Sequence, residues 1–136
     1  MRALGNGLPH SDLTVTADHG MIVDGLVINA SALVNGTTID WVQSSELPTL
    51  YTIYHVDTKA HDAILANGAP TETFFDCSGR RAFDNHQEHL DRDDAECIIP
   101  EMDRPRITSR RLLPGAIKAR LGIVDEGDCF DMQLTA

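Results

Sequence analysis

One dipeptide, Asp24-Gly25, constrains the fold of this chain more than any other feature, because it separates two short apolar runs. Asp-Gly is the strongest short hairpin signal, since a two-residue hairpin turn needs a positive φ at both central positions. It predicts one strand over residues 21–23 and another over residues 26–28. Upstream, residues 13–16 alternate apolar side chains with threonine, which predicts a half-buried strand that leads into a tight turn over residues 17–20. With residues 21–23 this strand is expected to form an opening hairpin over about residues 12–23.

Thr16 and His19 would lie at the end of that first strand and in its turn. A hydroxyl and an imidazole held there could act on the same carbonyl group. The alternatives are a threonine selected for its β propensity and a turn histidine that binds nothing. The turn is therefore the first candidate site in the chain.

Further short strands are expected in the first 75 residues. Residues 37–42 are rich in β-branched and aromatic side chains, and residues 50–57 alternate more clearly than any other segment. Residues 61–66 repeat the apolar pattern and stop at a second turn signal, Asn67-Gly68, while residues 30–34 allow one helical turn. Many short strands with such turns predict a mainly β domain over residues 1–75.

The character of the chain changes after residue 75. The first 75 residues carry two basic and eight acidic side chains, and residues 76–136 carry nine basic and thirteen acidic ones. Short helices are expected over residues 78–84 and 114–121, the latter capped by Gly122, and residues 85–96 read as a solvated acidic face. We therefore expect residues 76–136 to form a charged, partly helical extension that packs on the β domain or is partly disordered.

Composition excludes several partners and cofactors. A net charge of −10 argues against a nucleic acid and an anionic membrane surface, and no apolar run approaches a membrane span. No signal peptide is expected.

Cys77, Cys97 and Cys129 are odd in number and widely spaced, so neither a disulfide framework nor a Cys-x-x-Cys metal site is predicted. Free thiols favour a reducing compartment, the cytoplasm by default, with export inside a larger protein left open. His86 and His89 lie one helical turn apart, but zincin and EF-hand spacings are absent, so we expect no metal and no cofactor.

Two motifs, in order, resemble the Hint module, the hedgehog/intein self-processing domain. Residues 16–19 followed by an apolar strand resemble its Thr-x-x-His motif. Residues 54–57 and then 61–68 resemble the late intein motif, in which a strand precedes His-Asn-Phe-x-x-Asn-Gly. Residues 32–36 and 68–73 are similar to the bacterial Hint variety found in large secreted or phage-like proteins. The resemblance covers roughly residues 3 to 85.

The resemblance implies a mainly β, partial Hint fold whose ancestral activity is autoproteolysis, with the chain's own polypeptide as the substrate. In the family a cysteine or serine attacks the preceding carbonyl in an N-to-S or N-to-O acyl shift. His19 would donate to the scissile amide nitrogen, and Thr16 would orient that amide. His55 and His61 would serve as acid and base, with Asp57 paired to His55 on one strand face. Packing or hydrogen-bonding roles are the alternatives for both histidines.

The chain departs from the family in two ways. The family's nucleophile lies several tens of residues before the Thr-x-x-His motif, whereas fifteen residues precede Thr16 here and only Ser11 among them is a cysteine or serine. Glu72-Thr73 stands where inteins carry His-Asn, which removes asparagine cyclisation and therefore protein splicing. We expect a truncated module, or a relative that has lost self-cleavage, which does not cut itself as this chain.

A second hypothesis comes from a different class of function. A β domain that lacks its first strands would leave a sheet edge open, and an unpaired edge is a template for association. The chain would then be a non-enzymatic binding module that forms a homodimer or accepts a strand from an upstream segment.

Overall fold

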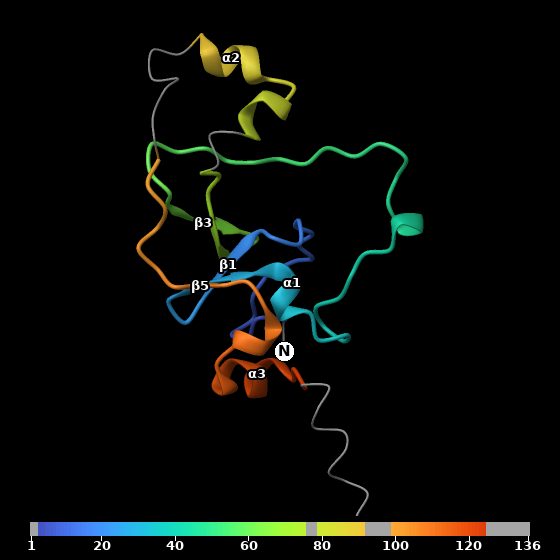
Figure 1. Cartoon of the computed structure of the whole chain (residues 1–136). Helices are drawn as coiled ribbons and strands as arrows, with labels where there is room; N and C mark the ends of the chain where they lie inside the picture. The colour runs from blue at the N-terminus through green and yellow to red at the C-terminus, as the bar shows by residue number, and fades with distance from the viewer. Residues whose placement is uncertain (1–2, 76–78, 92–98, 125–136) are drawn as a thin grey trace, which may run out of the picture.

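The structure is a computed structural model that describes residues 3–75, 79–91 and 99–124 of the 136-residue chain. Within these residues a five-stranded sheet has the order β3-β4-β1-β2-β5, and the helices are short (Figure 1). The expected mainly β fold with a partly helical C-terminal part is confirmed. The strands are β1 Gly20–Val23, β2 Leu26–Asn29, β3 Ala63–Ala66, β4 Ala69–Glu72 and β5 Arg106–Ile107. The helices are α1 Ala30–Leu33, α2 His86–Leu90 and α3 Gly115–Leu121, with 3-10 turns η1 Ser44–Glu46, η2 Gly79–Ala82 and η3 Arg110–Leu112.

The Asp24-Gly25 hairpin is confirmed, and it joins β1 to β2. Asp24 has φ of 51° and Gly25 has φ of 81°, which is the pair of positive angles that a tight hairpin requires. Val23 faces Leu26 across the turn, and the antiparallel register runs on to Gly20 opposite Asn29. The hairpin therefore fixes the position of Gly20, the residue that follows His19.

The other strands extend this hairpin on both sides. The Asn67-Gly68 signal forms a second hairpin between β3 and β4, and β4 joins β1 where Met21 faces Thr71. On the opposite side β5 pairs in parallel with β2, and Ile28 faces Ile107. A strand from the C-terminal part of the chain is thus hydrogen-bonded into the sheet built by the first 75 residues.

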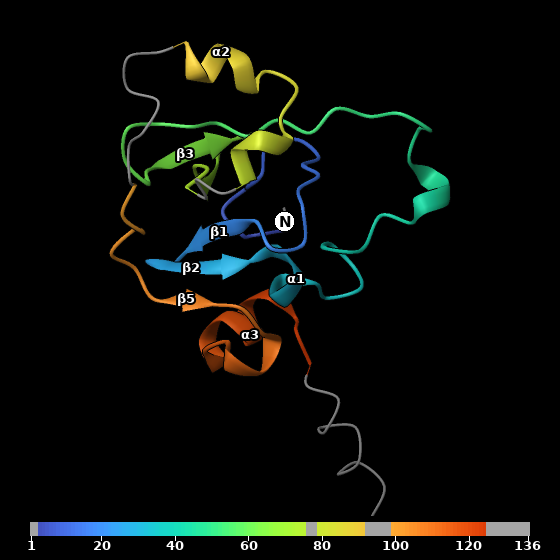
Figure 2. The same cartoon turned by 45° about the horizontal axis from the view of Figure 1, so that its top comes forward.

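The apolar core joins the same two parts of the chain. Ile28 and Leu33 are fully buried, and they cluster with Ile117 and Leu121 of α3. Figure 2 shows α3 next to β5, beside the sheet. The predicted helix over residues 114–121 is confirmed, and Gly122 caps it in the left-handed conformation at φ of 66°. No helix among the described residues is long and apolar enough to cross a membrane.

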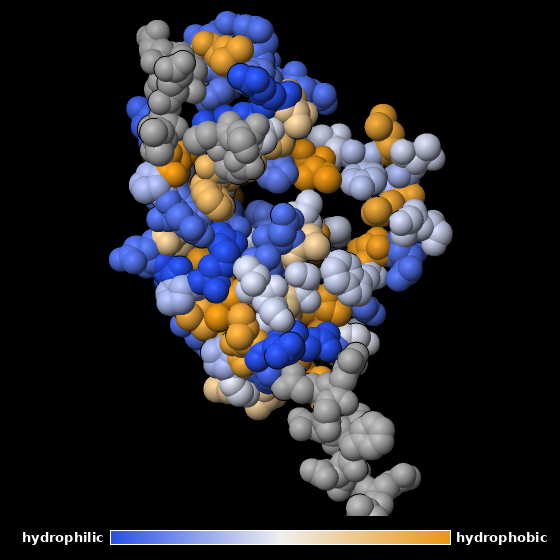
Figure 3. Space-filling view, in the orientation of Figure 1, coloured by the Kyte–Doolittle hydropathy of each residue, from blue (hydrophilic) through white to orange (hydrophobic). Residues whose placement is uncertain are grey.

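Three predicted strands are wrong, and so is the expected hairpin over residues 12–23, because β1 pairs with β2 and β4 instead of residues 13–16. Residues 13–16, 37–42 and 50–57 are not in any strand, although all three carry β-type sequences. Residues 50–57 run as an extended segment away from the sheet, with Leu50 89 % and Tyr54 84 % exposed. Figure 3 shows apolar side chains at the surface in this part of the molecule. β propensity reflects packing against a neighbouring strand, and apart from one bridge between Asp57 and Phe74 the described part of the chain places no strand beside this segment.

Candidate active site

The Thr16–His19 turn is confirmed and is tied to the start of β1 and to α1. The backbone N–H of His19 donates to the carbonyl of Thr16 at 3.2 Å, which closes the turn. The N–H of Ala30 donates to the carbonyl of His19 at 2.9 Å. The hydroxyl of Thr16 makes no hydrogen bond to another described residue. These bonds hold the backbone on both sides of the imidazole.

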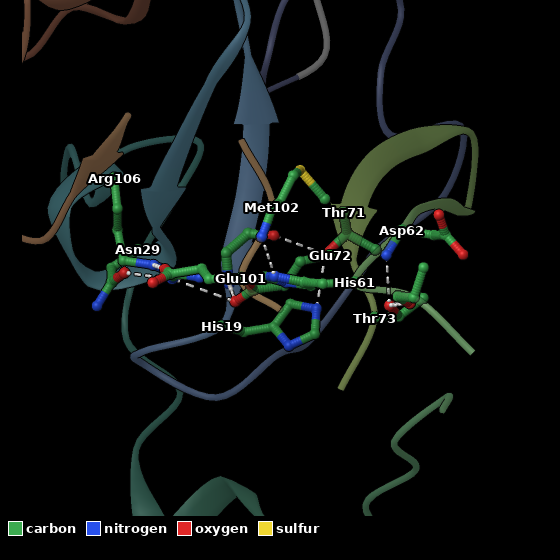
Figure 4. Close-up of polar contacts among 12 residues, drawn as sticks. His19, Asn29, His61, Asp62, Thr71, Glu72, Thr73, Glu101, Met102 and Arg106 are labelled. Atoms are coloured by element: carbon green, nitrogen blue, oxygen red, sulfur yellow. Dashed lines mark hydrogen bonds and ion pairs between the residues drawn. The ribbon is translucent and has the colours of Figure 1, made fainter. Parts of the chain in front are cut away.

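Thr71 on β4 holds the His19 side chain. Its Oγ1 lies 2.6 Å from Nε2 of His19 and donates to the carbonyl of Gly20 at 2.9 Å. Thr71 is only 2 % exposed, so this hydroxyl is fixed within the sheet. Figure 4 shows the Thr71 side chain at the His19 ring.

The other imidazole nitrogen of His19 is open. Nδ1 has no hydrogen-bond partner among the described residues, and this atom is not fully buried. Burial lowers the pKa of His19 below its ordinary 6.5, and the charge of Glu72 opposes this shift only in part. At neutral pH the neutral imidazole therefore predominates, and Nδ1 offers a lone pair.

Glu72, the neighbour of Thr71, is a buried carboxylate that binds three partners. It is 7 % exposed, and its Oε1 accepts from the N–H of Gly20 at 2.7 Å. Nε2 of His61 lies 2.9 Å from Oε2, and the guanidinium of Arg106 contacts both carboxylate oxygens. A Cβ on Gly20 would lie 2.5 Å from Oε1 of Glu72, so this contact requires glycine.

The charges around Glu72 change its titration. Burial alone would raise the pKa of this carboxyl, but the hydrogen bonds and charge of Arg106 lower it, together with the bonds from Gly20 and His61. The net effect is a pKa below the ordinary 4.5. Glu72 is therefore an anion at neutral pH, and the guanidinium of Arg106 neutralises it.

His61 has both ring nitrogens occupied. Nδ1 accepts the N–H of Met102 at 2.8 Å, so the proton of the neutral ring is on Nε2, which donates to Glu72. The ring stacks on Phe75 with centroids 4.3 Å apart, and its side chain is buried. This arrangement favours a role in holding Glu72 over proton transfer.

His55 and Asp57 lie in the extended segment, and no hydrogen bond joins them among the described residues. The His55 ring contacts Phe74 and Phe83, with centroids 5.3 Å and 5.1 Å away. Asp57 instead forms an ion pair with Arg80 at 2.8 Å. Both residues are exposed. Burial is the main cause of the lowered pKa of His19, and the charge of His55 adds to this effect. The structure thus brings His19 and His61 to one network and leaves His55 and Asp57 outside its hydrogen bonds.

The described residues contain no group of three potential metal ligands. His86 and His89 lie on α2 with ring centroids 6.4 Å apart. Cys77, Cys97 and Cys129 lie outside the described residues, as do residues 92–98 of the acidic run.

Sequence reasoning missed Thr71, Glu72 and Arg106 as site residues. Thr71 and Glu72 occupy the segment of residues 68–73 that resembles the Hint variety, and this was the one available signal. The sequence around Arg106 carries no such signal, because Pro105 predicts only extended backbone for this segment.

Comparison with known proteins identifies the family. The family model for the Hint domain matches residues 1–78, more than half of the chain. No curated protein and no solved structure matches the chain significantly. The matched region contains the Thr16–His19 turn, strands β1 to β4 and both Thr71 and Glu72. The chain therefore belongs to the Hint domain family.

Proposed function

We propose that this chain supplies the amide-handling part of a Hint autoprocessing site, which cleaves its own polypeptide by an N-to-S or N-to-O acyl shift. The observation that carries the proposal is the state of His19. Its Nε2 is held by a buried hydroxyl, while Nδ1 has no partner among residues 3–75, 79–91 and 99–124. The other imidazole of the network, His61, is bonded at both nitrogens. A ring held on one side and open on the other suits proton transfer.

The chemistry needs one proton to move twice. Nδ1 of His19 takes the proton of the attacking thiol or hydroxyl, whose sulfur or oxygen bonds to the scissile carbonyl carbon. The resulting imidazolium returns that proton to the amide nitrogen as the C–N bond breaks, leaving an ester or thioester and a free amine. The lowered pKa of His19, which burial causes, makes the proton easier to return. Thr16 orients the amide through its hydroxyl, which has no hydrogen-bond partner among the described residues.

His61 acts in this proposal through Glu72 and not on the substrate. Its two bonded nitrogens support a positioning role, because the ring would have to break one bond to accept or release a proton. His55 remains a proposed acid or base group, with Asp57 as its proposed partner. For His55 alone, this is supported by the contribution of its charge to the pKa of His19, which burial mainly lowers.

The residues before Thr16 include Ser11 but no cysteine, and we propose that these 136 residues alone do not cleave themselves. A mass spectrum of the purified chain after prolonged incubation should show one intact mass. Spontaneous cleavage at a specific bond would contradict this.

The activity itself is tested by joining an upstream segment that supplies a Hint-type Cys nucleophile. We expect cleavage before that cysteine. His19→Ala and replacement of the cysteine by alanine should each abolish cleavage, whereas the surface variant Asp24→Asn should cleave like the wild type. His55→Ala and Asp57→Asn report on the remaining acid and base roles. An inert complete chain would refute the proposal.

One observation favours a second candidate function, a non-enzymatic domain that associates with a second copy or an upstream strand. Seven large apolar side chains between residues 41 and 56 are at least 45 % exposed, an unusual density for one surface segment. They are Trp41, Val42, Leu50, Tyr51, Ile53, Tyr54 and Val56.

If the chain is an association domain, light scattering at a protein concentration on the order of tens of micromolar should detect a dimer, since exposed extended segments pair readily. Tyr54→Lys should weaken that dimer, whereas the same change at the exposed Leu112, outside the segment, should not. A strict monomer would count against association through this segment.

A further inference from the structure

We propose that Thr71 is a positioning residue that holds His19 as the Nε2–H tautomer and so presents Nδ1 as the reactive nitrogen. What Nδ1 acts on rests on the function proposed above. The tautomer itself follows from the hydrogen bonds of the described residues. Thr71 was not a candidate from the sequence, and it lies 52 positions from His19 in the chain.

The argument starts from the single proton of a hydroxyl group. Oγ1 of Thr71 donates to the carbonyl of Gly20 at 2.9 Å, and a carbonyl can only accept. The contact at 2.6 Å between the same Oγ1 and Nε2 of His19 must then be donated by the ring. The neutral ring carries one proton, so that proton is on Nε2 and Nδ1 has the lone pair.

The surroundings of Thr71 prevent the hydroxyl from turning elsewhere. Thr71 is 2 % exposed and pairs with Met21 between β4 and β1, and a β-branched side chain has a restricted χ1. Gly20 is held from its other side, because its N–H donates to the buried Glu72 at 2.7 Å. Adjacent residues of β4 therefore bind the N–H and the carbonyl of one residue, and the acceptor that orients the Thr71 proton is fixed.

This arrangement matters for the proposed reaction because, within the described part of the chain, only Nδ1 of His19 has no hydrogen-bond partner. With the proton fixed on Nε2, Nδ1 can accept from the nucleophile and then donate to the leaving amine. Without the Thr71 hydroxyl, the ring can place its proton on either nitrogen and can rotate. A fraction of the molecules would then present an N–H where a lone pair is needed.

The experiment measures the tautomer directly in the 136-residue chain. The chain is labelled with 15N at histidine, the His19 signals are assigned with His19→Gln, and the ring nitrogens are recorded above the pKa that burial lowers. We expect a protonated Nε2 and an unprotonated Nδ1. Thr71→Val should shift both nitrogen signals toward a mixture, and Thr71→Ser should restore them.

Thr73→Val is the matched control. Thr73 follows β4, is 1 % exposed, and its hydroxyl accepts from the N–H of Asp62 at 2.9 Å without contacting His19. This variant should leave the His19 signals unchanged. A wild-type ring protonated on Nδ1, or equal signals in wild type and Thr71→Val, would overturn the proposal. The wild-type spectrum decides the first point even if the valine variant does not fold.

The nucleophile-bearing chain separates this proposal from the function on which it rests. There Thr71→Val should slow cleavage at least about tenfold, a part of the roughly 10²–10⁴ that a positioned proton-transfer group contributes, and should alter the pH profile. Thr71→Ser should recover most of the rate. Cleavage that requires His19 but ignores Thr71 would overturn the positioning role alone. An inert chain with the expected tautomer would overturn the function and leave the tautomer assignment supported.

Discussion

The buried Glu72–Arg106 pair gives the sharpest stability prediction, tested with Glu72→Gln. The amide keeps the shape of the side chain and can still accept from the N–H of Gly20, which is 2.7 Å from Oε1. It loses the charge that faces Arg106. It also directs an N–H₂ group at Nε2 of His61, which is itself a donor because Nδ1 already accepts from Met102.

The expected cost is about 3 kcal/mol of unfolding free energy. Removing one partner of a buried ion pair costs about 3–5 kcal/mol, since the other charge stays buried without its counterion. The lower end applies because the Arg106 side chain is 22 % exposed and also pairs with Glu101 at 3.0 Å.

Urea unfolding followed by circular dichroism measures this loss, and Asp24→Asn is the isosteric control. Asp24 pairs with Arg120 at 3.0 Å, but both side chains are at least 40 % exposed, so about 0–1 kcal/mol is expected. Arg106→Met should cost less in the Glu72→Gln background than in the wild type, because the pair is already broken. A loss under about 1 kcal/mol for Glu72→Gln, or one matched by the control, would refute the reasoning.

Three further predictions concern stability. The pKa of Glu72 in the folded state lies below its ordinary 4.5, because burial, which raises it, is outweighed by the hydrogen bonds and charge of Arg106. The stabilisation from this carboxylate is therefore present above pH 4.5 and is lost as the pH falls through the folded-state pKa. The difference in unfolding free energy between wild type and Glu72→Gln, measured in urea, should shrink from about pH 7 to about pH 3. Gly20→Ala should cost about 1–3 kcal/mol, since its Cβ would meet Glu72 at 2.5 Å, whereas Gly115→Ala, with open space around it, should cost nothing in the same assay. Ile28→Ala should lower the unfolding free energy by about 2–5 kcal/mol and reduce the thermal midpoint accordingly. Leu65→Ala, at a side chain that is 71 % exposed, should barely change either quantity.

Much of the local structure was predictable from the residues. The hairpin β1–β2, the second hairpin β3–β4 and α3 with its Gly122 cap all follow from turn and capping residues. One helical turn was also expected where α1 lies, although α1 has no side-chain cap. The three failed strands share one cause. Each carries alternating or β-branched and aromatic residues, but a strand exists only where a neighbouring strand accepts its hydrogen bonds, and the sequence does not name that neighbour.

The candidate site was predictable in part. The Thr16–His19 turn was expected from the residues themselves, and the resemblance to the Hint family added His61 as a candidate. The family match bears out the resemblance. The roles of the two histidines could not be read from spacing. They depend on which ring nitrogens are bonded, and the partners Thr71, Glu72 and Met102 become neighbours only in the fold.

The sequence by itself determined the turns, because Asp24-Gly25 and Asn67-Gly68 adopt positive φ through local backbone chemistry alone. Tertiary structure decided which extended segments became strands, and it brought β5 from the charged C-terminal part to the edge of β2. It also assembled the network at Gly20, where Arg106 and Glu72 lie 34 positions apart in the chain and His19 and Thr71 lie 52 apart, as do Gly20 and Glu72. Such contacts form only when separate elements pack together, because a buried carboxylate and a buried hydroxyl must find partners that no local pattern supplies.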